Sequence, residues 1–158
     1  MLAPTPTVLI LCEDSKSSKD YLEDAKIKFR AQLSVRVLHP GITDPIGIVK
    51  AGIRKTRDFE RVFCVIDKDE HPSFESALSL ARENEKITVI PSYPCFEYWL
   101  LLHYLFSRKP YARAGNRSPA DCLIDDLKTI PEMSQYAKGS STTLFDGAPI
   151  AANKTPRP

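Results

Sequence analysis

The sequence has 158 residues, of which 42% are hydrophobic and 27% charged, and its formal net charge is +2 at pH 7. A chain of this length and composition suits one folded domain, or one domain with an appendage, and excludes a chain that is mainly disordered. The small net charge decides nothing by itself, so a role in nucleic-acid binding would have to come from local clusters of basic residues.

Hydrophobic periodicity predicts alternating strands and helices along residues 1–93. Runs rich in Val and Ile predict strands that are covered on both faces, and apolar residues at helical spacing predict the helices between them. In chain order we expect a strand at 7–12, a helix at about 19–29, a strand at 34–38, a helix at 46–57, a strand at 61–66, a helix that Ser73 can cap, and a strand at 87–90. This order predicts an α/β fold with a mostly parallel four-stranded sheet flanked by helices.

The pattern changes after residue 93. The segment 95–104 is apolar nearly all round, which predicts a buried helix with Trp99 in the core or an interface. Another helix is expected to begin at Ser118 and Pro119. We therefore expect residues 94–145 to form a helical extension packed on the α/β core of residues 1–93. Residues 146–158 have no periodic apolar face, which predicts a disordered tail.

The cysteines and the apolar runs predict a cytoplasmic protein that does not associate with a membrane. None of the four cysteines belongs to a Cys-x-x-Cys pair, so reduced thiols are favoured over disulfides or a zinc site. The longest apolar run, near residues 98–105, is too short to span a bilayer, and no signal peptide is evident. A homo-oligomer is left open.

Acidic side chains directly follow two of the expected strands. Glu13 and Asp14 come after the strand at 7–12, and Asp67 and Asp69 come after the strand at 61–66. In a parallel sheet these carboxyl ends lie at one edge, where open α/β sheets bind their ligands. Carboxylates gathered there repel one another unless a cation lies between them, and their hard oxygens suit Mg²⁺ or Mn²⁺. The alternative is a set of solvated acids at the starts of loops, and the residues alone leave both interpretations open.

A metal site of this kind suits phosphoryl transfer or phosphodiester cleavage, with Glu13 as a general acid or base if its neighbours raise its pKa. The sequence has no GxxxxGK[ST] loop and no GxGxxG after a strand, which argues against ATP or NAD binding of those kinds. It also has no GxSxG motif of a serine nucleophile. Glu97, at a helix start, is either a further metal or water ligand or a carboxylate that favours the helix dipole. Basic residues within 108–117 either follow a nucleic-acid backbone or belong to a solvated linker, namely Arg108, Lys109, Arg113 and Arg117.

Three longer segments resemble one family. The stretches 10–13, 62–71 and 92–103, together with the shorter stretch 136–139, resemble the RloB-like family of prokaryotic proteins over roughly residues 7–145. The resemblance implies a TOPRIM-type fold and a Mg²⁺-dependent endonuclease, in which the metal and acid/base residues map onto Glu13, Asp67 and Asp69. Lys138, in the last stretch, would then stabilise transition-state charge on phosphate. Family members usually have glycine where this chain has Asp14.

The same resemblance implies a role in anti-phage defence of the abortive-infection kind, beside an ABC-type ATPase partner. Two other functions are weighed against the nuclease. A phosphoacceptor receiver domain would use Asp67 with Ser92 after the fourth strand, but no fifth strand ending in Lys is visible. The other is a non-catalytic TOPRIM-like interaction module.

Overall fold

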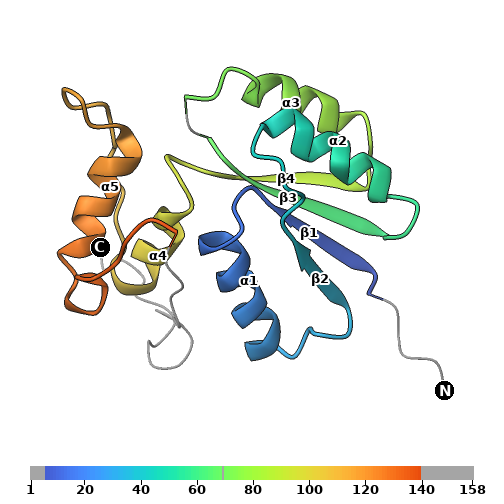
Figure 1. The fold of residues 1–158 in the computed structure, drawn as a ribbon, viewed down its shortest axis with the longest axis horizontal. Coiled ribbons are helices and arrows are strands. Elements are labelled where there is room, and N and C mark those ends of the chain that lie inside the picture. The colour runs from blue at the N-terminus through green and yellow to red at the C-terminus, as the bar shows by residue number, and fades with distance from the viewer. Residues whose placement is uncertain (1–5, 69, 140–158) are drawn as a thin grey trace, which may run out of the picture.

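The four expected apolar runs form one parallel sheet in the computed structural model, which describes residues 6–68 and 70–139 (Figure 1). The strands are β1 (Val8–Cys12), β2 (Val35–Leu38), β3 (Arg61–Asp67) and β4 (Ile87–Ser92). Their order in the sheet is β2-β1-β3-β4, and every neighbouring pair is parallel. The predicted Rossmann-like α/β architecture is therefore confirmed.

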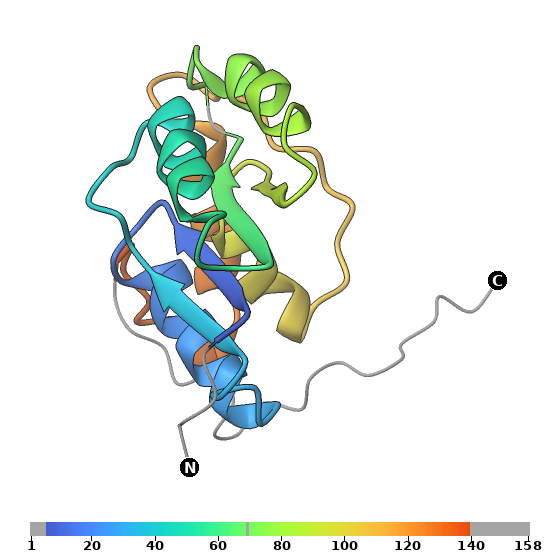
Figure 2. The same cartoon turned by 90° about the vertical axis from the view of Figure 1, so that its right-hand side faces the viewer.

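The connections between the strands decide which face of the sheet each helix covers. The chain moves from β1 outward to β2 through α1 (Ser17–Lys28), and then in the other direction through α2 (Pro45–Lys55) and α3 (Phe74–Arg82). Because such crossovers are right-handed, a reversal of direction places the helix on the opposite face. Accordingly α1 lies on one side of the sheet, and α2 and α3 lie together on the other (Figures 1 and 2).

The main hydrophobic core lies between the sheet and the helices α2 and α3. It includes the fully buried side chains of Leu9, Ile48 and Ile66. Helix α2 approaches the sheet closely at Gly52, where a Cβ atom would lie 3.2 Å from the Sγ of Cys64. A larger residue at this position would therefore push the helix away from the strands.

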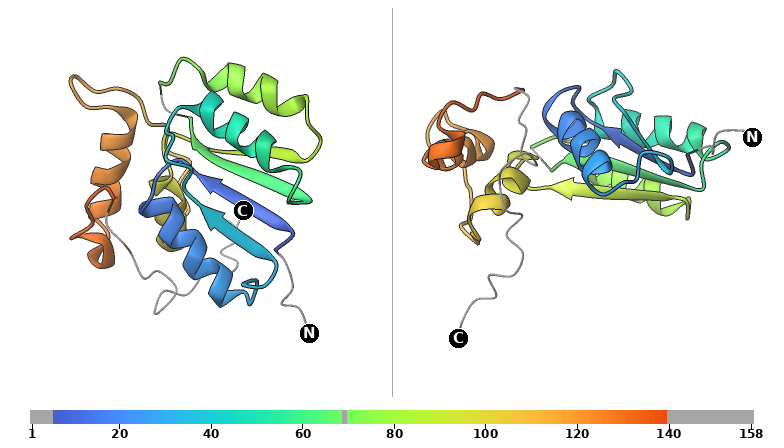
Figure 3. Two further views of the ribbon diagram at one scale, coloured as in Figure 1. Left: turned by 45° about the vertical axis from the view of Figure 1, so that its right-hand side comes forward. Right: turned by 90° about the horizontal axis from the view of Figure 1, so that it is seen from below.

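A second apolar cluster holds the helices after β4 together. These are α4 (Glu97–Tyr104), α5 (Pro119–Lys128) and a short 3₁₀ helix, η1 (Pro131–Met133). They lie beyond the carboxyl ends of the strands (Figures 1 and 3). Tyr21 of α1 packs edge-on against Phe96, with ring centroids 5.3 Å apart, and so joins this cluster to the α/β part.

The predicted helix at 95–104 is buried at Leu100 and Leu101, but Trp99 does not lie in the core, and its predicted alternative place in an interface stays a prediction. This side chain is 42% exposed, whereas Leu100 and Leu101 are buried in the second cluster. The indole Nε1 donates a hydrogen bond to the buried Ser92 Oγ at 3.0 Å. Trp99 therefore satisfies its polar atom at the end of β4 while one side of its ring stays in solvent.

The prediction that Ser73 caps the helix α3 is wrong. Ser73 precedes α3 but makes no side-chain cap, because its hydroxyl donates instead to Asp44 Oδ1 at 2.6 Å. Asp44 itself accepts the amide of Gly47 at 2.9 Å and caps α2. One acid thus serves the start of α2 and ties it to the start of α3.

The predicted start of the last helix is confirmed. Ser118 and Asp121 form a reciprocal capping box at the beginning of α5.

All four cysteines are free thiols, as expected. Among the described residues, no helix has the length and apolar character needed to cross a membrane. The predicted tail at 146–158 lies outside the described residues.

Candidate functional site

Glu13 and Asp67 lie side by side at the carboxyl edge of the sheet. The register pairs Cys12 of β1 with Val65 of β3, so Glu13 continues along β1 next to the last residues of β3. The Glu13 carboxylate accepts a hydrogen bond from the backbone amide of Asp67 at 2.6 Å. Two acids more than fifty positions apart in the sequence are therefore held together by a backbone contact that depends on strand register.

Asp67 is surrounded by other carboxylates. The pKa of Asp67 is raised from 3.8 to about 8, first by burial and then by the charges of Glu13 and Glu97. Lys138 opposes this shift. Since these charges act on one carboxyl group, three acids and one lysine from four separate segments meet in a single place.

Glu97 is buried at the start of α4, with 2% of its surface exposed. Its carboxylate accepts a hydrogen bond from the Tyr136 hydroxyl at 2.8 Å. Burial and the neighbouring Glu97 charge raise the pKa of the Tyr136 hydroxyl, which keeps it protonated as a donor. Helix α4 thus carries the acid, and Tyr136, which lies 39 positions later in the sequence, holds it in place.

The Tyr136 hydroxyl also links Glu97 to the segment that contains Lys138. Ser17 Oγ lies 3.4 Å from the hydroxyl and accepts the Gly139 amide at 3.2 Å. These contacts fasten residues 136–139 across the start of α1. Lys138 is thereby placed over the acids, which its sequence position alone does not indicate.

A cavity of about 330 Å³ opens between these groups. Glu13, Asp67 and Lys138 lie on its wall together with Glu97. The other lining residues come from the loops after β1 and β2 and from the segments near α4 and the chain's last described residues, and they are Asp14, Ser15, Ser17, His39, Thr43, Phe96 and Gly139.

Asp14, at the position where the family resemblance leads us to expect glycine, holds the start of α1 through its carboxylate. Its carboxylate accepts the backbone amide of Ser18 at 3.2 Å and the Ser18 hydroxyl at 2.6 Å. It also accepts the Lys16 amide at 2.9 Å. The negative charge at this position therefore satisfies free amides at the start of α1.

His39 is the site residue that sequence reasoning missed. It follows β2 directly and lines the cavity with the acids. Its Nδ1 lies 3.0 Å from the carbonyl oxygen of Cys12. Its position in the sequence could have identified it, because a polar side chain immediately after a parallel strand lies at the same edge of the sheet as Glu13 and Asp67.

The donor set fits a hard divalent cation held by few protein ligands. Carboxylates that lie close together, as Glu13 and Glu97 lie near Asp67, are relieved of their repulsion either by a proton or by a cation between them. Within residues 6–68 and 70–139, no three His, Cys, Asp or Glu side chains are arranged to hold one ion by themselves. Mg²⁺ binds through one or two carboxylates and completes its shell with water and substrate phosphate, so Glu13 and Asp67 could hold it. Asp69 lies outside the described residues.

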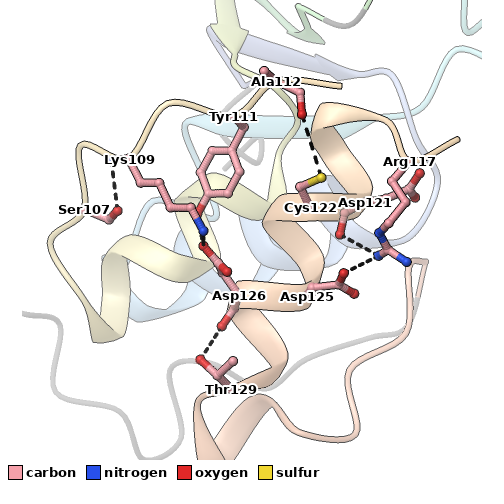
Figure 4. A network of polar contacts seen from close by, with 10 residues as sticks. All are labelled: Ser107, Lys109, Tyr111, Ala112, Arg117, Asp121, Cys122, Asp125, Asp126 and Thr129. Carbon is pink, nitrogen blue, oxygen red and sulfur yellow. Dashed lines mark hydrogen bonds and ion pairs between the residues drawn. The ribbon is translucent and has the colours of Figure 1, made fainter. Parts of the chain in front are cut away.

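The four basic residues predicted to contact nucleic acid lie on the segment before α5 and largely pair with acids. Lys109 Nζ contacts Asp126 Oδ2 at 2.7 Å, and Arg117 pairs with Asp125 (Figure 4). Arg113 makes a two-pronged contact with Glu70, and the Arg108 guanidinium lies 5.4 Å from the ring centroid of Phe106. These exposed pairs join the segment to α5 and to the loop after β3.

A second cavity, of about 450 Å³, is lined in part by residues that follow β3. Its wall includes Arg113, the half-exposed ring of Tyr93 and Lys68. Lys68 directly follows Asp67, so adjacent residues of the chain line the two cavities. Of the four predicted basic residues, Arg113 is the one that lines this cavity.

The family model for RloB-like proteins matches residues 8–152. No curated protein and no solved structure matches the chain.

Proposed function

Because the chain belongs to the RloB-like family, we propose that it is a Mg²⁺-dependent endonuclease with a TOPRIM-type site. The observation that carries the proposal is the meeting of Glu13, Asp67, Glu97 and Lys138 around one cavity at the carboxyl edge of the sheet. Acids in such a crevice, with a lysine opposite them, suit the binding of a metal ion and a phosphate together.

In this proposal Glu13 and Asp67 hold the metal ion, and Asp69, two positions after Asp67 in the sequence, is a further ligand that the family resemblance implies. Glu97 supports the same ion or one of its waters. When bound, Mg²⁺ polarises the scissile phosphate and lowers the pKa of a water molecule. Lys138 places a positive charge opposite the acids, where it can stabilise the charge that develops on the phosphate oxygens.

The proposed setting is anti-phage defence with an ABC-type ATPase partner, in the cytoplasm. The defence role and the ATPase partner rest on the family alone, whereas the cytoplasmic location rests on the cysteines and the apolar runs of the sequence. The substrate is nucleic acid, and the basic segment at 108–117 is proposed to contact its backbone through residues that exchange their present acidic partners for phosphate, as exposed ion pairs do at little cost.

The test replaces single acids by their amides. Glu13→Gln keeps an oxygen that can accept the Asp67 amide, so the fold is retained while a metal ligand is weakened. We expect Glu13→Gln and Asp67→Asn each to lose cleavage of single-stranded DNA, double-stranded DNA or RNA by at least about a hundredfold with Mg²⁺ or Mn²⁺. The control is Glu75→Gln in the first turn of α3, which should cleave like the unmodified protein.

Cleavage is measured with and without the partner ATPase, and circular dichroism verifies the fold of each variant. Absence of cleavage of every substrate with either metal, in both settings, would reject the nuclease. Retention of ATPase binding in that case would favour the non-catalytic interaction module. Phosphorylation of Asp67 by acetyl phosphate would favour the receiver domain, although no fifth strand is present among the described residues.

A further inference from the structure

All four strands deliver a polar side chain to the same edge, and only the residue after β2 has no part in the scheme above. Glu13 follows β1, Asp67 ends β3, and Glu97 begins the helix after β4. His39 occupies the equivalent place after β2 and lines the same cavity. Because β2 is the neighbour of β1, the histidine enters the cavity from the Glu13 side.

One hydrogen bond determines which ring nitrogen of His39 carries the proton. Nδ1 lies 3.0 Å from the Cys12 carbonyl oxygen, and a carbonyl oxygen can only accept. Nδ1 is therefore protonated and donates. In the neutral ring the other nitrogen, Nε2, then has a lone pair and acts as the acceptor.

The backbone around His39 is stiff. β2 ends at Leu38, and Pro40 follows the histidine, which restricts the conformations of both residues. Gly41 then turns the chain with a φ of +75°, a conformation that glycine adopts freely. The ring is thus anchored at Nδ1 and carried by a short rigid segment, as expected for a side chain with a defined orientation in a site.

We propose that His39 is the general base of the reaction in the Glu13–Asp67 cavity, accepting a proton at Nε2 from the attacking water. This inference rests on the proposed nuclease function. The water oxygen forms the new bond to phosphorus while one of its protons passes to Nε2. The old P–O bond breaks with its electron pair on the leaving oxygen, which takes a proton from solvent. The imidazolium then releases its proton to solvent, so the net reaction consumes one water for each phosphodiester.

If His39 had only a structural role, it would need only its Nδ1–H. Two substitutions separate this structural role from proton acceptance at Nε2. His39→Asn keeps an N–H donor near the place of Nδ1 but has nothing at the place of Nε2. His39→Gln reaches toward the place of Nε2 with an amide that cannot take up a proton. We expect both variants to lose kcat by roughly 10²–10⁴-fold with little change in KM. The control is His71→Asn on the loop after β3, which should retain kcat.

A thermal melt of each variant accompanies the kinetics. If His39→Asn melts like the unmodified protein and also keeps its kcat, the histidine only supports the Cys12 carbonyl and the inference is overturned. If it melts normally and loses kcat while His71→Asn does not, the inference is supported.

A second measurement does not depend on catalysis. The chain has three histidines, so ¹⁵N spectra of histidine-labelled protein are simple, and His39→Asn assigns the signals of His39. We expect the Nδ1–H tautomer, and a change at Nε2 when Mg²⁺ and thymidine 3′,5′-bisphosphate are added. The Nε2–H tautomer, or no response to this probe, would overturn the inference even if the protein cleaves nucleic acid. Conversely, a protein that cleaves nothing but shows the expected tautomer and response would refute the nuclease and leave His39 as an acceptor at a phosphate site.

Discussion

Replacing Tyr136 by phenylalanine removes one hydroxyl from a buried carboxylate and leaves the aromatic ring in place. Tyr136 is 5% exposed and Glu97 is 2% exposed, so water cannot readily replace the 2.8 Å hydrogen bond between them. A hydrogen bond to a charged group contributes about 1.5–3 kcal/mol, because the acceptor otherwise remains buried with one fewer donor. We therefore expect Tyr136→Phe to lower the free energy of unfolding by about 2 kcal/mol.

The assay is urea unfolding followed by far-ultraviolet circular dichroism in the presence of a chelator, so that no metal ion compensates the Glu97 charge. With an m-value of about 2 kcal/mol per molar urea, the midpoint should fall by about 1 M. Combining Tyr136→Phe with Glu97→Gln in a double-mutant cycle should give a coupling of about 1–2 kcal/mol.

The matched comparison is Tyr98→Phe, which removes a 2.6 Å hydrogen bond to the uncharged carbonyl of Ser107. That loss should cost only about 0.5–1.5 kcal/mol. If Tyr136→Phe costs less than Tyr98→Phe, or if the cycle shows no coupling, then the hydroxyl does not hold the Glu97 carboxylate. The proposed fastening of the segment that carries Lys138 would be refuted with it.

Two further predictions concern the thiols and the response to acid. Burial raises the pKa of Cys12 and Cys64 to about 12 and raises that of Cys95 as well. Of the four thiols, only the half-buried Cys122 should therefore react quickly with a disulfide reagent near neutral pH. A second thiol that reacts quickly would contradict the packing of these cysteines. The hydrogen bond from Lys109 lowers the pKa of Asp126 below its ordinary 3.8, so this contact stabilises the fold above about pH 4 and is lost as the pH falls through the lowered value. Asp126→Asn should therefore flatten part of the acid side of a stability-against-pH curve below pH 4, and an unchanged curve would contradict the pairing seen in Figure 4.

Most strand and helix positions follow from local sequence, but several individual side chains do not. The segments predicted at 7–12 and 61–66 became β1 and β3 with ends shifted by one residue. Ser73 has the residue type of a cap, yet its hydroxyl contacts Asp44, which lies almost thirty positions away. Trp99 is apolar and lies in an apolar run, yet it faces solvent because its helix packs on one side only. Hydrophobic periodicity predicts which face of a helix or strand is buried, whereas these outcomes depend on which distant residues contact the side chain.

The same distinction applies to the candidate site. The sequence alone determined that acids follow two parallel strands, and a parallel sheet necessarily brings such ends to one edge. Only the tertiary structure decided that β1 and β3 are neighbours, that Tyr136 contacts Glu97, and that His39 enters the same cavity. The physical reason is that strand formation depends on a few adjacent residues, whereas the meeting of side chains depends on strand order and on contacts between distant segments, which no local window of sequence contains.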